Sequence, residues 1–126
     1  MRNERGFTLI EIIAVLVILG ILAAVAVPRY LDMQGEARIK AAQAAIAEVK
    51  AQASQFYGIK LLRTGTAASV TAADILSSIG AAPDVGADFT VAAAVSGSDI
   101  TITVSQVQGV ALSPSQVGTW TMPSAF

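Results

Sequence analysis

The chain has 126 residues, of which 54% are hydrophobic, and its formal net charge at neutral pH is −1. This length allows one small domain beside an anchor segment. The chain has no cysteine and no histidine, which excludes a disulfide scaffold, a cysteine-type zinc site and a nucleophile activated by histidine. Residues 64–126 hold four aspartates and no lysine or arginine, and this charge disfavours binding of nucleic acid.

An apolar run from Phe7 to Val27 follows a short charged segment and contains a single charge, Glu11. As an α-helix the run would extend over roughly 30 Å, which is enough to cross the hydrocarbon core of a bilayer. A carboxylate at full membrane depth costs about 2.5–3.5 kcal/mol, and less near the interface. Because nothing else in the run can pair with it, we expect the partner of Glu11 to lie outside this segment, on another molecule.

The stretch from Met1 to about Tyr30 resembles a type IV prepilin. The resemblance rests on a charged leader that ends in Gly6, on Phe7 directly after it, and on Glu11 at the fifth position after that glycine. It implies cleavage between Gly6 and Phe7 by a prepilin peptidase, which also methylates the new amine of Phe7. A secretory signal peptide fits poorly, because its apolar core is shorter and precedes the cleavage site. A plain single-pass anchor explains the length of the run but not these residues.

The same resemblance assigns roles in assembly. It implies that Glu11 meets the N-terminal amine of a neighbouring subunit, a pairing that also has a physical reason, since a buried carboxylate is tolerated only when paired. Gly20 and Pro28 fall where the family softens its first helix, and the segment between them is expected to lose helicity in a filament. Ordinary transmembrane glycine and proline are the simpler interpretation, since both are common there. Many type IV pilins close a C-terminal loop with a disulfide, which this chain cannot form.

After Pro28 the helix is expected to continue with a kink. Apolar residues at spacings of three and four form one stripe between Ile39 and Phe56, and the helix should end between Gly58 and Gly65. Thr71 followed by Asp74 predicts a capped short helix. Its expected range is Ala72–Ile79.

The remaining sequence alternates between apolar and polar residues, as strands do. The expected strands are Phe89–Val95, Ile100–Val104, a short one at Gly109–Leu112 and a closing one at Thr119–Met122, with turns at Ser96–Asp99 and Pro114–Gly118. The predicted fold class is α+β: a long N-terminal helix, transmembrane in its first half and amphipathic in its second, packed against a small antiparallel sheet of three or four strands. We expect the stripe residues Ile46, Val49, Ala53 and Phe56 to face Phe89, Val91, Ile100, Ile102 and Trp120.

These patterns divide the chain into four parts. They are a leader at 1–6, a hydrophobic transmembrane or filament-core helix at 7–28, an amphipathic second half of the helix at 29–63, and a globular head at 64–126.

Other candidate sites have simpler interpretations. Asp84, Asp88 and Asp99 lack the dense spacing of oxygen ligands that calcium favours, so we interpret them as turn residues. The aromatic residues Tyr30, Phe56, Tyr57 and Trp120 are interpreted as core packing and not as a path for electrons. We expect no catalytic residue, metal or cofactor.

The predicted function is a structural subunit that polymerises through its N-terminal helix into a type IV pilus filament. The alternative is a pseudopilin of a type II secretion or DNA-uptake system, although the Tyr-Pro and Pro-Trp-Gly-type motifs of major pseudopilins are missing. A minor pilin is also possible, and an enzyme on a membrane tether is disfavoured. The expected partners are further copies of the chain in a helical filament, the prepilin peptidase and the pilus assembly machinery. The precursor is expected in the inner membrane and the assembled subunit in an extracellular pilus.

Overall fold

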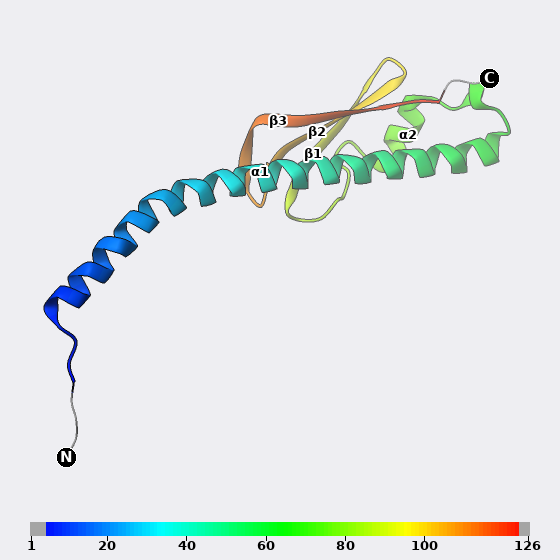
Figure 1. The fold of residues 1–126 in the computed structure, drawn as a ribbon. Helices are drawn as coiled ribbons and strands as arrows, with labels where there is room; N and C mark the ends of the chain where they lie inside the picture. The colour runs from blue at the N-terminus through cyan, green and yellow to red at the C-terminus, as the bar shows by residue number, and fades with distance from the viewer. Residues whose placement is uncertain (1–4, 124–126) are drawn as a thin grey trace. The chain divides into compact units, whose positions relative to one another are not determined.

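The structure is a computed structural model that describes residues 5–123 (Figure 1). Its elements are, in chain order, α1 (Leu9–Thr64), the 3-10 helix η1 (Ala67–Ser69), α2 (Ala72–Ile79), β1 (Phe89–Ser96), β2 (Asp99–Val107) and β3 (Val110–Thr121). The chain divides into two compact units, one up to Glu36 and one from Ala37 onward. The second unit, residues 37–126, is called the head unit below. This is the α+β fold that the sequence predicts.

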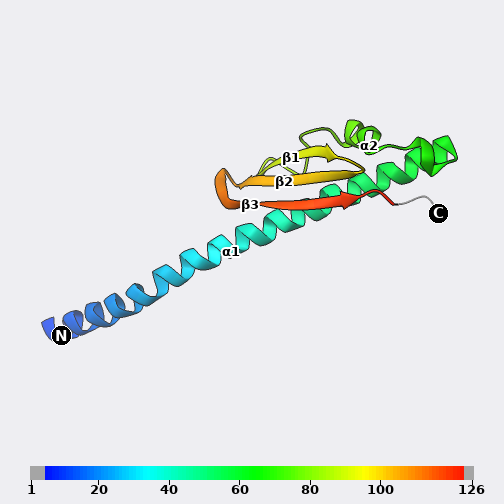
Figure 2. The ribbon, with the colours of Figure 1, turned by 90° about the horizontal axis from the view of Figure 1, so that it is seen from above.

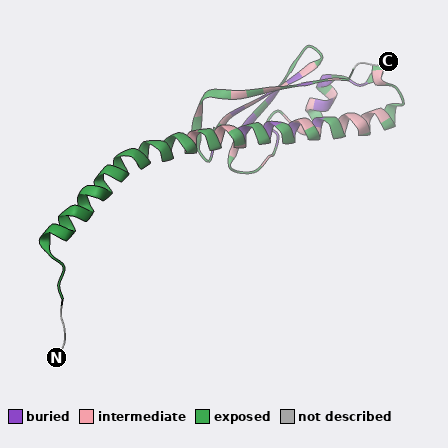
Figure 3. Cartoon of the chain, viewed as in Figure 1, coloured by how far each residue is buried: buried purple, intermediate pink, exposed green. Residues whose placement is uncertain are grey.

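The first unit consists of the N-terminal part of α1 and the residues before it. The helix begins at Leu9 and runs without interruption past Pro28, even though a proline within a helix removes one backbone hydrogen bond. The apolar side chains of this part are exposed, as the green colour in Figure 3 shows. By length and composition, α1 qualifies as a helix that could cross a membrane.

In the head unit, α1 packs one face against the sheet. The buried residues of this part are Ala42, Ala45, Ile46, Val49 and Ala53. Their spacing follows the period of an α-helix, so that they form a single stripe. The predicted amphipathic half of the helix is therefore confirmed, and so is its end, because α1 stops at Thr64.

The sheet has three antiparallel strands in the order β1-β2-β3, so that β1 and β3 lie at its two edges (Figure 2). Its inward face pairs Val91 with Val104 and Ile100 with Trp120. The register shifts once in each pairing, between Thr90 and Val91 and after Val104. The first two strands match the prediction, β1 with Ser96 added and β2 with Asp99 and Ser105–Val107 added.

The predicted turn at Pro114–Gly118 is wrong, because β3 is one strand that runs through both residues. Pro114 lies on an edge strand, in the stretch Leu112–Ser115 that has no paired residues between the Gln106–Ala111 and Val104–Gln116 pairs. An edge or a bulge is where a strand tolerates proline. Gly118 lies against α1, where a side chain would not fit: an added Cβ would overlap Cγ2 of Ile46 and come within 3.3 Å of Lys50 Cε.

The short helix α2 has the predicted bounds and the predicted cap. The Thr71 backbone N–H donates to Asp74 Oδ2 at 3.0 Å, and the Asp74 backbone N–H donates to Thr71 Oγ1 at 3.2 Å. This reciprocal pair is a capping box, which satisfies two helix-terminal N–H groups. The helix places Ile75 in the core with no exposed surface.

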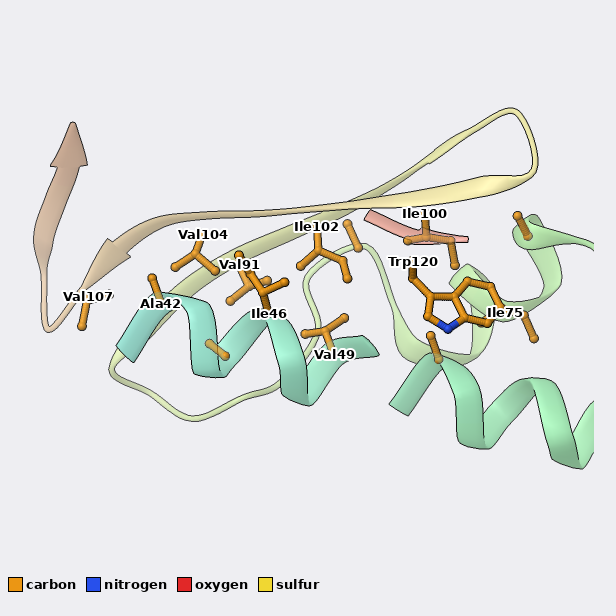
Figure 4. Close-up of a cluster of buried hydrophobic side chains, with 14 of the residues drawn as sticks. Ala42, Ile46, Val49, Ile75, Val91, Ile100, Ile102, Val104, Val107 and Trp120 are labelled. Atoms are coloured by element: carbon orange, nitrogen blue, oxygen red, sulfur yellow. The ribbon is translucent and has the colours of Figure 1, made fainter. Parts of the chain in front are cut away.

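The core lies between α1 and the inward face of the sheet, and α2 adds to it (Figure 4). Its largest fully buried side chains are Ile75, Ile100, Ile102, Val49 and Val104. Trp120 closes one end, and the ring of Tyr57 meets it edge-on with centroids 6.1 Å apart. The predicted packing of the stripe against the strands is confirmed, with Phe56 and Phe89 only partly buried.

One aromatic residue differs from the prediction. Tyr30 was expected in a core, but its side chain is 63% exposed. The reason is that Tyr30 belongs to the first unit, which has no sheet to cover it.

Candidate processing and assembly site

The predicted cleavage site lies just before α1. Residues 5–8 are not helical, and α1 begins at Leu9. Phe7 is 86% exposed, and no atom lies within 4 Å of a Cβ built on Gly6. A protease must reach the backbone on both sides of the bond it cuts, and the Gly6–Phe7 peptide is open in this way.

Glu11 has a hydrogen-bond partner within its own chain. Its Oε2 atom accepts a bond of 2.8 Å from the backbone N–H of Thr8 and one of 2.9 Å from Thr8 Oγ1. The Glu11 N–H approaches Thr8 Oγ1 at 3.4 Å. This is a second capping box, at the start of α1. The expectation that the run itself could offer Glu11 no partner is therefore wrong.

Thr8 is the residue that the sequence reading missed. A threonine three residues before a glutamate, directly ahead of an apolar run, is a known signal for a helix start, and it was available in the sequence. The box fixes the Glu11 carboxylate at the N-terminal turn of α1. A negative charge there is favoured by the partial positive charge of the helix N-terminus.

Gly20 and Pro28 both lie inside α1, and each is exposed. A Cβ built on Gly20 meets nothing within 4 Å, so that no packing contact among residues 5–123 requires a glycine there. Neither residue lies near Glu11, because both are further along the same helix by two or more turns. The predicted loss of helicity between them concerns an assembled state and stays a prediction.

Asp84 and Asp88 lie in the irregular segment between α2 and β1, whereas Asp99, which was expected in a turn, is the first residue of a strand. Asp84 Oδ1 accepts a bond of 3.0 Å from the backbone N–H of Gly86, and the backbone carbonyl of Asp88 accepts one of 2.6 Å from Gln108. Asp99 begins β2, and its Oδ1 is buried without a hydrogen-bond partner among residues 5–123. Over the same residues there is no group of three or more acidic side chains that could hold a metal ion.

Comparison with known proteins finds a family description that matches the N-terminal segment and relatives that match part of the chain. The family description "Prokaryotic N-terminal methylation motif" matches residues 1–27. A fimbrial protein of Pseudomonas aeruginosa is 40% identical over 53 residues, which are 42% of this chain and 34% of that protein. The type II secretion system core protein G of Pseudomonas aeruginosa is 46% identical over 50 residues, or 40% of this chain and 35% of that protein.

A third relative is the type IV narrow pilus major component of Thermus thermophilus, which is 46% identical over 48 residues. That match covers 38% of this chain and 41% of the relative. The chain thus matches these curated relatives over well under half of their length, and no solved structure matches it. The chain carries a prepilin-type N-terminal methylation motif, and over part of its length it is similar to fimbrial proteins, a type IV pilus component and a type II secretion core protein.

Proposed function

We propose that this chain is a pilin, a structural subunit that polymerises through α1 into a type IV pilus filament. The observation that carries the proposal is the stretch of α1 from Leu9 to Val27, which is apolar, is exposed along its whole length and has Glu11, near its start, as its one charge. Such a helix needs cover from a membrane or from other helices. A pilin uses both in turn, first as a membrane-anchored precursor and then as part of a filament outside the cell.

Within this proposal the parts of the chain have separate tasks. Residues 1–6 are the leader, 7–28 the transmembrane and filament-core helix, 29–63 its amphipathic second half, and 64–126 the globular head. The prepilin peptidase cuts between Gly6 and Phe7 and methylates the Phe7 amine. The assembly machinery of the inner membrane then takes up the mature subunit. The role is structural, so no catalytic residue and no cofactor is assigned.

Glu11 supplies the charge for assembly. Its carboxylate, held by Thr8 in the subunit, pairs with the Phe7 amine of a neighbouring copy. Gly20 and Pro28 are the points at which α1 loosens in the filament, because neither residue favours a helix interior.

The names of the relatives support the proposal. Fimbrial proteins and a type IV pilus component are among them. A pseudopilin of a type II secretion system is the second candidate, and the match to core protein G favours it.

Imaging and mass spectrometry test the proposal together. Cells that express the chain should carry long surface filaments, which cells without the gene lack. The sheared filament protein should begin at methylated Phe7. An N-terminus at Met1 or after Val27 would contradict the processing, and short periplasmic assemblies in place of surface filaments would favour the pseudopilin.

A further inference from the structure

The head unit carries a basic flank along one side of α1, defined by Lys40 and Lys50. Both lie on one helical stripe, whose members Lys40, Gln43, Ala47, Lys50 and Ser54 follow spacings of three and four. Lys40 Nζ donates to Gln43 Oε1 within this stripe at 3.5 Å. The flank is thus a row of polar and small side chains whose charges are all positive.

The basic flank borders β3. A Cβ on Gly118 would lie 3.3 Å from Lys50 Cε, and Ser54 Oγ accepts a hydrogen bond from Trp120 Nε1 at 2.9 Å. β3 itself has no charged residue from Val110 to Thr121, and it leaves Val117 60% exposed. This side of the head unit therefore combines Lys50, with Lys40 at the outer margin of the stripe, with an uncharged strand at the edge of the sheet.

The other side of α1 carries an acidic flank, defined by Glu48, Asp84 and Asp88. The Gln52 side-chain amide donates to Glu48 Oε1 at 3.4 Å and to the Asp84 carbonyl at 3.3 Å, which brings the turn before β1 to this side of the helix. Around the helix, Glu48 lies about 160° from Lys50 and about 80° from Lys40, so that Lys50 is the lysine on the side opposite to Glu48. Since Asp88 directly precedes β1, the acidic flank borders the edge of the sheet opposite β3.

Within residues 5–123, the charged side chains of the two flanks bond to uncharged groups. Between residues 5 and 123, the side-chain hydrogen bonds of Glu48 and Asp84 come from an amide and from a backbone N–H, and none comes from a lysine or arginine. Lys40 likewise donates to an amide oxygen. Each flank therefore presents a charge of one sign to whatever lies beside it.

We propose that the two flanks bind each other in successive copies of this chain, with the basic flank of one head unit against the acidic flank of the next. Because the two surfaces differ, the contact is heterologous, and repeating it builds an open helical assembly instead of a closed dimer. Charge complementarity of this kind mainly selects the partner and its orientation. The inference rests on the proposed filament and names the surfaces by which its heads pack.

Charge reversal in the full chain tests the contact. Lys40→Glu combined with Lys50→Glu should lower the yield of sheared filaments by roughly tenfold or more, because like charges then meet across the contact. Glu48→Lys combined with Asp88→Lys should have the same effect. Asp84 stays unchanged in these variants, because its carboxylate holds the turn through Gly86. All four changes in one chain restore opposite charges and should recover most of the yield.

A control is Arg63→Glu, a charge reversal at the far end of α1, compared with Lys50→Glu alone; the Arg63 variant should leave the yield near that of the wild type. The amount of each variant in the membrane and the mass of its mature N-terminus serve to show normal insertion and cleavage. If the reversed pairs assemble as well as the wild type, or if the fourfold variant does no better than either pair, the contact is wrong. If the wild type forms no filament, the proposed function fails, and this inference with it.

Discussion

Gly118 of β3 lies so close to Ile46 of α1 that a Cβ at position 118 would overlap Ile46 Cγ2. The helix and the edge strand therefore approach at a point where only glycine fits. Gly118 pairs with Ile102, one of the fully buried residues of the core. The contact brings α1 and β3 together beside the core.

Gly118→Ala should therefore destabilise the head unit. Forcing an extra methyl group into packed surroundings typically costs about 1–3 kcal/mol. Denaturant unfolding of the full chain in detergent, followed by the fluorescence of the single tryptophan, measures the loss. The control is Gly58→Ala, because a Cβ there meets nothing within 4 Å and Gly58 lies within α1. That change should be neutral or stabilising, and an equal loss in both variants would contradict the close approach.

Ser54→Ala should leave the indole N–H of Trp120 without its partner at 2.9 Å. Trp120 is buried, and an unsatisfied buried donor costs about 1–3 kcal/mol. Unfolding measured by tryptophan fluorescence should report both the lower stability and a changed environment of the ring. Ser113→Ala, at an exposed position of β3, is the control and should unfold like the wild type. Unchanged stability of the Ser54 variant would mean that the bond contributes nothing.

Ile102→Ala should cost about 2–5 kcal/mol, since the residue is fully buried at the centre of the sheet. Phe56→Ala should cost less than a typical buried phenylalanine, which is about 3–5 kcal/mol, because Phe56 is only partly buried. Thermal unfolding of the two variants side by side gives the comparison. A larger loss at Phe56 than at Ile102 would contradict the burial seen here.

The capping box of α2 predicts a dependence of stability on pH. Hydrogen bonds from the side chain and the backbone of Thr71 lower the pKa of Asp74 from its ordinary value of 3.8. A carboxyl whose pKa is lower in the folded state contributes its full stability above the unfolded value of 3.8 and loses it as the pH falls through the lowered value. Thr71→Ala should thus be less stable than the wild type near neutral pH, and the difference should shrink in acid. A difference that is constant with pH would argue against this linkage.

Glu11→Ala should leave the protein inserted and cleaved but prevent filament assembly. Removing the charge makes α1 more apolar, so that insertion improves. What is lost is the pairing with the Phe7 amine of a neighbour, which is worth about 4 kcal/mol at 4 Å and an effective dielectric constant near 20, with desolvation offsetting much of it.

The matched variant Glu11→Gln keeps the shape of the side chain and removes only its charge. It should fail in assembly as Glu11→Ala does. Filament yield after shearing, checked by electron microscopy, decides between the outcomes. Normal filaments from both variants would rule out the pairing.

The sequence by itself determined the elements that depend on local patterns. The apolar run predicted the first part of α1, the stripe from Ile39 to Phe56 predicted its packed face, and Thr71 with Asp74 predicted the start of α2. These features follow from the period of a helix and from hydrogen bonds between residues three apart. The Thr8–Glu11 box belongs to the same class and was readable in principle.

The tertiary structure alone decided how β3 runs. Proline and glycine are turn signals locally, and Pro114 and Gly118 therefore suggested a turn. In the fold, Pro114 lies at an edge strand beside a register shift, and Gly118 makes room for Ile46. The division of charge between the two flanks of α1 also follows only from the fold, because it depends on which edge of the sheet each turn and strand occupies. Such relationships join residues far apart in sequence, and no local pattern carries them.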